Sequence, residues 1–159
     1  MEYSSDELCK LWKEFSAKEI QYIITGTVAI HFHGFPMADS FIECWIKDSE
    51  ENRRRLDDVF HTLGYTTDFR LKKEKLPPGA GYLVPMEDLE VIIYTDADGV
   101  NTDFDNCLKL SSVAEIQGIR IPFLHIDHLL DSKKISKRRN GDAIVRELER
   151  IRKIREQEG

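Results

Sequence analysis

The sequence predicts an α/β (α+β) fold, with a mixed sheet flanked by helices and closed by C-terminal helices. Short β-branched segments alternate along the chain with segments of helical periodicity, which is typical of a sheet covered by helices. The chain has 159 residues, of which 41% are hydrophobic and 33% charged, a balance typical of a globular domain. Because we find no internal repeat, low-complexity tract or linker, we expect residues 1–159 to form a single domain.

The first half of the chain predicts three helices and two strands. Apolar residues spaced at i, i+3, i+4 and i+7 follow Ser5, a plausible N-cap, and indicate a helix; they are Leu8, Leu11, Trp12 and Phe15. Residues 20–25 are β-branched and predict a buried strand, and residues 27–33 predict a short helix. Residues 41–46 predict a second strand. Ser49 then caps a helix that Gly64 ends.

The second half predicts two strands and two closing helices. Residues 66–81 are polar and contain Pro77-Pro78-Gly79, so we expect a loop or hairpin there. Strands are expected at 89–95 and within 116–123, and helices at 126–135 and 142–154. Residues 96–105 form an acidic loop. This loop resembles a calcium-binding loop only superficially, because its glycine is at the fourth position instead of the sixth.

Charge and cysteine content exclude several classes of protein. Lys and Arg total 23 against 29 Asp and Glu, so a net charge of −6 disfavours binding to duplex nucleic acid. No segment reaches the roughly 20 apolar residues of a membrane span. The first seven residues are acidic and lack the pattern of a signal peptide. Three widely spaced cysteines indicate free thiols, and we expect a cytoplasmic protein.

The first candidate for chemistry is the junction of a strand and a helix at Gly26 and Thr27. A glycine at this point lets a backbone or a phosphate approach closely. The free N–H groups and the positive dipole of the following helix suit an anion, and the Thr27 hydroxyl could donate a hydrogen bond. A glycine that merely turns a strand into a helix would have the same pattern.

The second candidate is a set of carboxylates on two predicted strands. Because side chains alternate along a strand, Asp39, Phe41 and Glu43 share one face. Asp88 and Glu90 share a face of the later strand. If the two strands are neighbours, Glu43 and Glu90 converge. Paired carboxylates on adjacent strands build magnesium sites for phosphoryl chemistry, although acidic residues also mark exposed strand ends.

Taken together, these segments resemble the nucleotidyltransferase fold family, and most closely small bacterial members related to abortive-infection toxin nucleotidyltransferases. The resemblance lies in the strand–Gly26–helix unit, Gly34-Phe35-Pro36, the acidic strand and the helix that follows it. The tail is also similar, with a strand at 118–124, a helix with lysines, a basic cluster and Asp142. The resemblance covers residues 21–148.

The resemblance implies a reaction and a set of residues. Family members transfer a nucleotide from a nucleoside triphosphate to an acceptor with the help of two divalent ions, so Mg²⁺ or Mn²⁺ is the implied cofactor. Glu43 and Glu90 are the implied catalytic residues, and with Asp39 they are the implied metal ligands. The implied nucleotide-binding residues are Gly26, Thr27, Lys133 and Lys134.

The sequence departs from the family pattern at the metal site. Thr27 replaces the second glycine, Met37 the arginine, and Phe41 the first metal-binding aspartate. Phenylalanine cannot ligate Mg²⁺. Asp39 lies on the same strand face, but about 6–7 Å further along. The chain is therefore either an active nucleotidyltransferase or a catalytically impaired relative that keeps the nucleotide pocket.

A different class of function stays open. The chain could be a non-catalytic interaction module with a protein partner, such as one half of a toxin–antitoxin-like pair. An exposed apolar patch around Phe32, Phe35 and Met37 would favour it.

Overall fold

The structure, a computed structural model, describes residues 5–36, 41–72, 76–132, 137–138 and 140–158. Its helices are α1 (Asp6–Ala17), α2 (Gly26–Phe32), α3 (Glu50–Thr62), the 3₁₀ helix η1 (Phe69–Leu71), α4 (Phe104–Leu110), α5 (Ile126–Asp131) and α7 (Gly141–Glu158). Its strands are β1 (Tyr22–Thr25), β2 (Phe41–Ile46), β3 (Gly81–Pro85), β4 (Glu90–Tyr94), β5 (Ser112–Ile116) and β6 (Ile119–Phe123).

The strands form one six-stranded sheet in the order β3-β4-β2-β1-β6-β5. β2 runs parallel to β4, and β1 runs parallel to β6. The other neighbouring pairs are antiparallel. The predicted mixed sheet flanked by helices is therefore confirmed.

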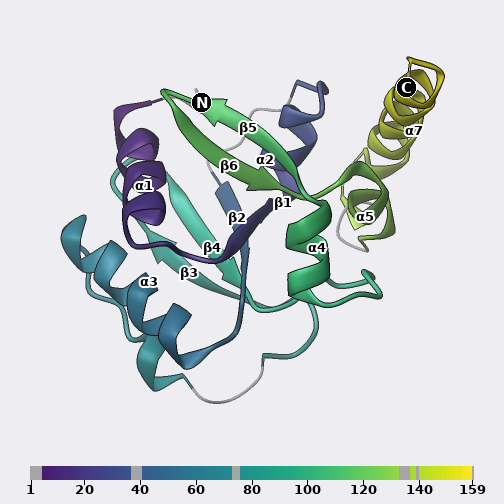
Figure 1. Cartoon of the computed structure of the whole chain (residues 1–159). Coiled ribbons are helices and arrows are strands. Elements are labelled where there is room, and N and C mark those ends of the chain that lie inside the picture. Colours follow the sequence, from purple (N-terminus) through teal and green to yellow (C-terminus); the bar gives the residue numbers. More distant parts are fainter. Residues whose placement is uncertain (1–4, 37–40, 73–75, 133–136, 139, 159) are drawn as a thin grey trace.

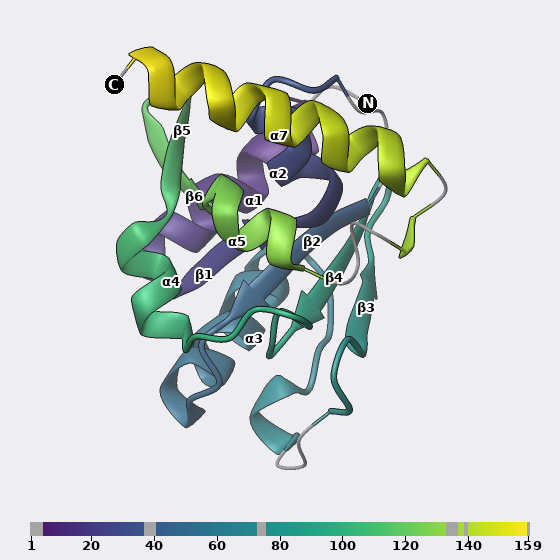
Figure 2. The same ribbon diagram turned by 90° about the vertical axis from the view of Figure 1, so that its right-hand side faces the viewer.

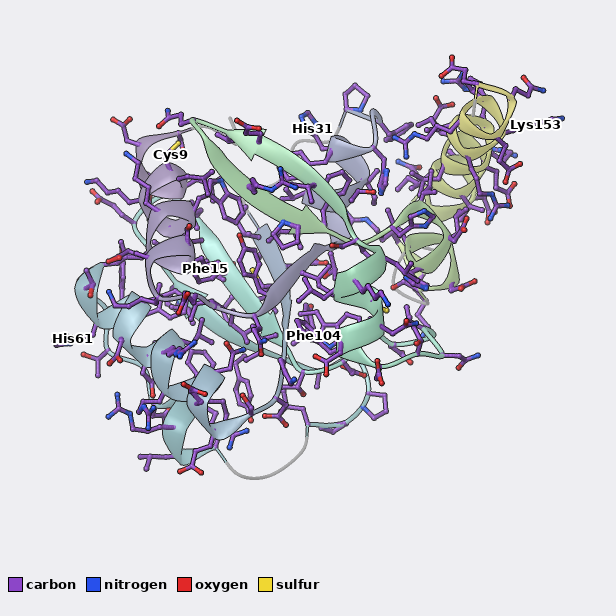
Figure 3. All side chains as sticks on the ribbon, viewed as in Figure 1. Cys9, Phe15, His31, His61, Phe104 and Lys153 are labelled. Carbon is purple, nitrogen blue, oxygen red and sulfur yellow. The ribbon has the colours of Figure 1, made fainter. Side chains whose placement is uncertain are left out.

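Helices cover both faces of the sheet (Figures 1 and 2). α1 and α3 lie on one face, and α4 and α5 lie on the other. Phe15 of α1 packs against Tyr22 of β1, with ring centroids 4.7 Å apart, and Phe104 of α4 packs against Trp45 of β2 at 5.3 Å. Figure 3 shows Phe15 on α1 and Phe104 on α4. Because Tyr22 and Trp45 point to opposite faces, these two contacts define the two layers.

The face under α1 and α3 holds the main hydrophobic core. Alternate residues of the central strands point into it and are almost fully buried, including Ile24, Ile42, Cys44, Val91 and Ile93. The other two cysteines, Cys9 and Cys107, are also buried, and all three are free thiols, as expected.

Asn52, near the start of α3, ties this helix to the sheet. Its side chain accepts a hydrogen bond from the Gln21 N–H at 2.9 Å and donates to the carbonyls of Gln21 and Lys47 at 3.0 and 2.9 Å. Ser49 caps the helix as predicted, since its hydroxyl accepts from the Asn52 N–H. One amide side chain thus satisfies three backbone groups at the ends of β1 and β2.

Asp57 anchors the segment that follows α3. Its buried carboxylate accepts hydrogen bonds from the Thr67 hydroxyl, from the N–H groups of Phe69 and Arg70, and from the Arg70 side chain. Burial alone would raise the pKa of Asp57, but these hydrogen bonds outweigh it and hold the pKa below its usual value.

The C-terminal helix α7 is attached through a buried histidine. The Nε2 atom of His33 lies 2.8 Å from the Leu124 carbonyl, and its Nδ1 atom lies 3.0 Å from Nη1 of Arg155 on α7. Ile144 and Leu148 are the buried apolar residues of α7. Within the described ranges, no helix combines the length and the apolar character needed to cross a bilayer.

Two predicted loops need correction, and one predicted strand is confirmed with an added partner. The loop or hairpin predicted at 66–81 contains η1 and is followed by β3, a strand that was not predicted. The strand predicted within 116–123 is confirmed as β6, which forms a hairpin with β5, a strand that was not predicted. The acidic loop ends at Asp103, two residues earlier than predicted, because α4 begins at Phe104; the Asp103 side chain caps this helix by accepting a hydrogen bond from the Asn106 N–H.

Candidate functional site

Gly26 and Glu43 are in direct contact where β1 ends and α2 begins. Thr25 on β1 is the register partner of Glu43 on β2, so Gly26 follows immediately beside the glutamate. A Cβ atom at Gly26 would lie 2.5 Å from Cδ of Glu43 and closer still to Oε2. Gly26 also has a φ of +64°, which L side chains rarely adopt. The Glu43 carboxylate therefore lies against the start of α2, and only glycine fits at position 26 without a shift.

Glu90 lies on the neighbouring strand and on the same face as Glu43. In the parallel pairing of β2 and β4, Phe41 is opposite Glu90 and Glu43 is opposite Ile92. The two glutamates are thus diagonal neighbours, with Cα atoms about 8 Å apart by ordinary sheet spacing. Both side chains are only partly buried. The register therefore brings together two carboxylates that are 47 positions apart in the sequence.

Phe41 occupies the strand position directly opposite Glu90. It shares the face of both glutamates and is partly exposed. A residue at this position is closer to Glu90 than Glu43 is, because direct partners across a sheet are closer than diagonal ones. An apolar ring therefore stands where a further carboxylate would make the tightest pair with Glu90.

The other predicted site residues have different outcomes. Thr27 is 1% exposed, so its hydroxyl faces the interior and not solvent. Asp39, Lys133 and Lys134 lie outside the described residues, and so their roles stay predictions. Within the part of the chain that the structure describes, no three His, Cys, Asp or Glu side chains are grouped so as to hold a metal ion.

The negative charge of Glu43 affects two buried neighbours. Burial, with smaller contributions from the charges of Glu43 and Asp96, raises the pKa of Tyr94 to about 12. Burial and the charge of Glu43 also raise the pKa of the Cys44 thiol. This part of the sheet thus favours neutral or cationic groups over additional anions.

Tyr94 depends on a glycine that the sequence did not single out. A Cβ atom at Gly81 on β3 would lie 2.7 Å from Cε1 of Tyr94 and 2.6 Å from Cγ2 of Ile92. Gly81 and Tyr94 are register partners at the end of the β3–β4 ladder. In a sequence, a glycine inside a strand can indicate such a close approach of neighbouring groups. Gly81 is the glycine of β3, the strand that also contains Pro85.

The apolar patch that would favour an interaction module is only partly described. Phe32 and Phe35 are partly buried and pack against the core, and the Phe32 ring lies 5.3 Å from that of Phe123. Met37 lies outside the described residues.

Comparisons with known proteins agree with the fold. No family model matches the chain, and no curated protein matches it. Solved structures do match. Two are structures of the antibiotic-resistance factor ANT(2″)-Ia, one in solution and one a crystal structure in complex with adenylyl-2″-tobramycin. Each has 13% identity, a TM-score of 0.56 and covers 96% of this chain, and the match spans 90% and 97% of those chains respectively.

A third match is a "putative nucleotidyltransferase (TM1012)" from Thermotoga maritima, with 15% identity and a TM-score of 0.55. It covers 94% of this chain and 89% of the other. Together with the mixed sheet, these likenesses show that the chain has the nucleotidyltransferase fold. At such identities they carry the fold alone.

Proposed function

We propose that this chain binds a nucleoside triphosphate together with a divalent cation, Mg²⁺ or Mn²⁺, and that it transfers the nucleotide only weakly. The observation that carries the proposal is the arrangement on one sheet face of Glu43, Glu90 and Phe41. The fold and the paired glutamates support binding. The phenylalanine directly opposite Glu90 argues against efficient transfer.

The donor set fits one ion better than two. Glu43 and Glu90 offer the carboxylate oxygens that Mg²⁺ prefers, and both lie on adjacent strands of the same face. When bound, the ion would neutralise phosphate charge. A two-ion site needs further carboxylates that bridge the ions, and Phe41 cannot supply one. We therefore expect metal-dependent binding of nucleotide that exceeds any transfer.

The phosphates would lie near the start of α2. The positive dipole end of a helix favours an anion, which supports a place for the phosphates beside Gly26 and Thr27. The buried Thr27 hydroxyl is not required for this role. Lys133 and Lys134 are proposed to complete the site by pairing with the phosphates.

The crystal structure of ANT(2″)-Ia is a complex with adenylyl-2″-tobramycin, so tobramycin is the first acceptor to include in the transfer experiment described next.

The decisive experiment restores the missing carboxylate. The Phe41→Asp variant should raise the rate of nucleotide transfer from labelled nucleoside triphosphates in the presence of Mn²⁺, because aspartate directly opposite Glu90 adds an ion ligand. Glu43→Gln should abolish Mn²⁺-dependent nucleotide binding while keeping the size of the side chain. Glu115→Gln, on the exposed edge strand β5, is the control for loss of one charge.

Two results would contradict the proposal. One is nucleotide binding that is equally strong in Glu43→Gln and in the unchanged protein. The other is fast transfer by the unchanged protein that Phe41→Asp does not increase, which would show that Phe41 does not limit the reaction.

A further inference from the structure

The tip of the β3–β4 hairpin is held by the first turn of α1. Two adjacent N–H groups at this tip donate to one carboxylate. The Glu87 N–H lies 2.9 Å from Oε1 of Glu7, and the Asp88 N–H lies 2.9 Å from Oε2. The Glu87 N–H is also 3.0 Å from the hydroxyl oxygen of Tyr65, which follows α3. We call these three contacts the hairpin clamp.

The hairpin clamp lies next to Glu90, the glutamate that is proposed to bind the ion. The Met86 N–H donates to the Leu89 carbonyl at 2.8 Å across the turn, and Glu90 is the next residue of the chain. Leu89 is 3% exposed in the core, so Glu90 points to the opposite face, which it shares with Glu43. About 7 Å of strand separates Glu90 from the clamped N–H of Asp88. The position of the tip therefore affects the position of Glu90.

A carboxylate suits position 7 better than a neutral group does. Each of its oxygens accepts one N–H, and hydrogen bonds to an ionised acceptor are stronger than neutral ones. The first turn of a helix also favours negative charge, which stabilises the ionised form of Glu7. An amide of the same size has one oxygen and one NH₂ group, so it can accept from only one side. Glutamine at this position would therefore keep the shape and lose one of the two bonds.

We infer that Glu7 is a positioning residue for the ion site: by fixing the tip of the hairpin, it holds Glu90 where it can share an ion with Glu43. This inference rests on the proposed function. Glu7 itself touches neither the ion nor the nucleotide, because α1 covers the opposite face of the sheet. Without the clamp, Glu90 spends part of the time away from the ion, and the apparent dissociation constant rises as the competent fraction falls.

The first measurement needs no ligand. Amide hydrogen exchange and amide chemical shifts of the full chain are compared between the unchanged protein and Glu7→Gln. Exchange should be faster in the variant at the N–H groups of Glu87 and Asp88. The amide signals of Glu90 and of Phe41, its register partner on β2, should shift because the end of β4 moves.

The second measurement is the affinity for a nucleoside triphosphate with and without Mn²⁺. Glu7→Gln should raise the dissociation constant in the presence of Mn²⁺ about fivefold, which corresponds to about 1 kcal/mol. It should leave binding without Mn²⁺ unchanged, because Glu90 contributes through the ion. If Glu7→Gln does not fold, Tyr65→Phe removes the other acceptor of the Glu87 N–H and should raise the constant by a smaller factor.

Two controls separate positioning from a general loss of stability. Glu87→Gln removes a charge beside the clamp but keeps the backbone N–H that donates to Glu7, so the affinity should stay the same. Ser49→Ala removes the N-cap of α3 and destabilises the protein without touching the hairpin. Because binding is measured on folded protein, Ser49→Ala should change neither the affinity nor the Glu90 amide signal.

Equal affinities of the unchanged protein and Glu7→Gln in the presence of Mn²⁺ would overturn the inference. The same holds if Ser49→Ala weakens binding as much as Glu7→Gln does, since lost stability would then be the cause. Both results leave Mn²⁺-dependent binding by the unchanged protein in place, and with it the proposed function. If the unchanged protein binds nucleotide no better with Mn²⁺ than without it, the proposed function fails and the role of Glu7 fails with it.

Discussion

The contact between Gly26 and Glu43 gives a sharp test of the site, through the substitution Gly26→Ala. The substitution adds one methyl group at a backbone φ of +64°. A left-handed conformation costs an L residue about 1–2 kcal/mol. The new Cβ would also lie 2.5 Å from Cδ of Glu43, so the glutamate has to turn away. A side chain forced off its rotamer costs about 0.5–1.5 kcal/mol more.

These two contributions can be separated with a matched glycine. Gly118 has a φ of +78° and open space around its Cβ position, so Gly118→Ala should show the conformational cost alone. Gly26→Ala should therefore be less stable than Gly118→Ala by about 1 kcal/mol, or about 2–4 °C in melting temperature for a chain of this size. In a Glu43→Ala background, Gly26→Ala should cost no more than Gly118→Ala.

The assay is thermal and urea unfolding of the four proteins that make up the Gly26–Glu43 cycle, together with Mn²⁺-dependent nucleotide binding by each. Gly26→Ala should weaken binding because it displaces Glu43 from its place beside Glu90. The reasoning would be refuted if Gly26→Ala cost the same with and without Glu43, because the carboxylate would then not lie against the glycine.

Three further predictions concern stability and ligands. Asn52→Ala should reduce the free energy of unfolding by about 3 kcal/mol, because it removes the partners of three backbone groups of Gln21 and Lys47; a loss below about 1 kcal/mol in urea unfolding would contradict this. Burial lowers the pKa of His33 from 6.5 to about 4, outweighing the hydrogen bond to Leu124. The unfolded chain therefore binds the extra proton first, and up to about 3 kcal/mol of stability should be lost as the pH falls from about 6.5 to about 4. His33→Gln should lose less over that window, and an identical pH profile would argue against the assignment. Finally, a nucleoside triphosphate with Mn²⁺, at about 100 times its dissociation constant, should stabilise the protein by about 2.7 kcal/mol. A chelator or Glu43→Gln should remove that increase in melting temperature, and its persistence would show that neither the ion nor Glu43 is needed.

Local signals in the sequence were sufficient for the elements that bury a regular face. The spacing of Leu8, Leu11, Trp12 and Phe15 predicted α1, and the alternation in residues 41–46 predicted β2 with the bounds that the structure has. By contrast, β3 contains Gly81 and Pro85 and buries only Val84 fully, so its pattern is too weak to indicate a strand. The edge strand β5 has no fully buried residue, and its pairing with β6 supplies what its own sequence does not.

The candidate site depended more on pairing than on periodicity. Alternation could place Phe41 and Glu43 on one face, but only the parallel register of β2 and β4 brings Glu90 beside them. The burial of Thr27 could not be predicted from the sequence either, because it results from packing around α2. The contact of His33 with Arg155 joins residues 122 positions apart in the chain. Such long-range contacts leave no mark at either position alone.

The three cysteines have a practical consequence for spectroscopy. Cys9, Cys44 and Cys107 are all buried, and burial raises the pKa of both Cys44 and Cys107, so thiol reagents should react slowly with the folded protein. A fluorophore or spin label could therefore be attached to one engineered surface thiol without first replacing the natural ones. Labels introduced on α7 and on β3 would report how the far sides of the molecule move when a nucleotide is added.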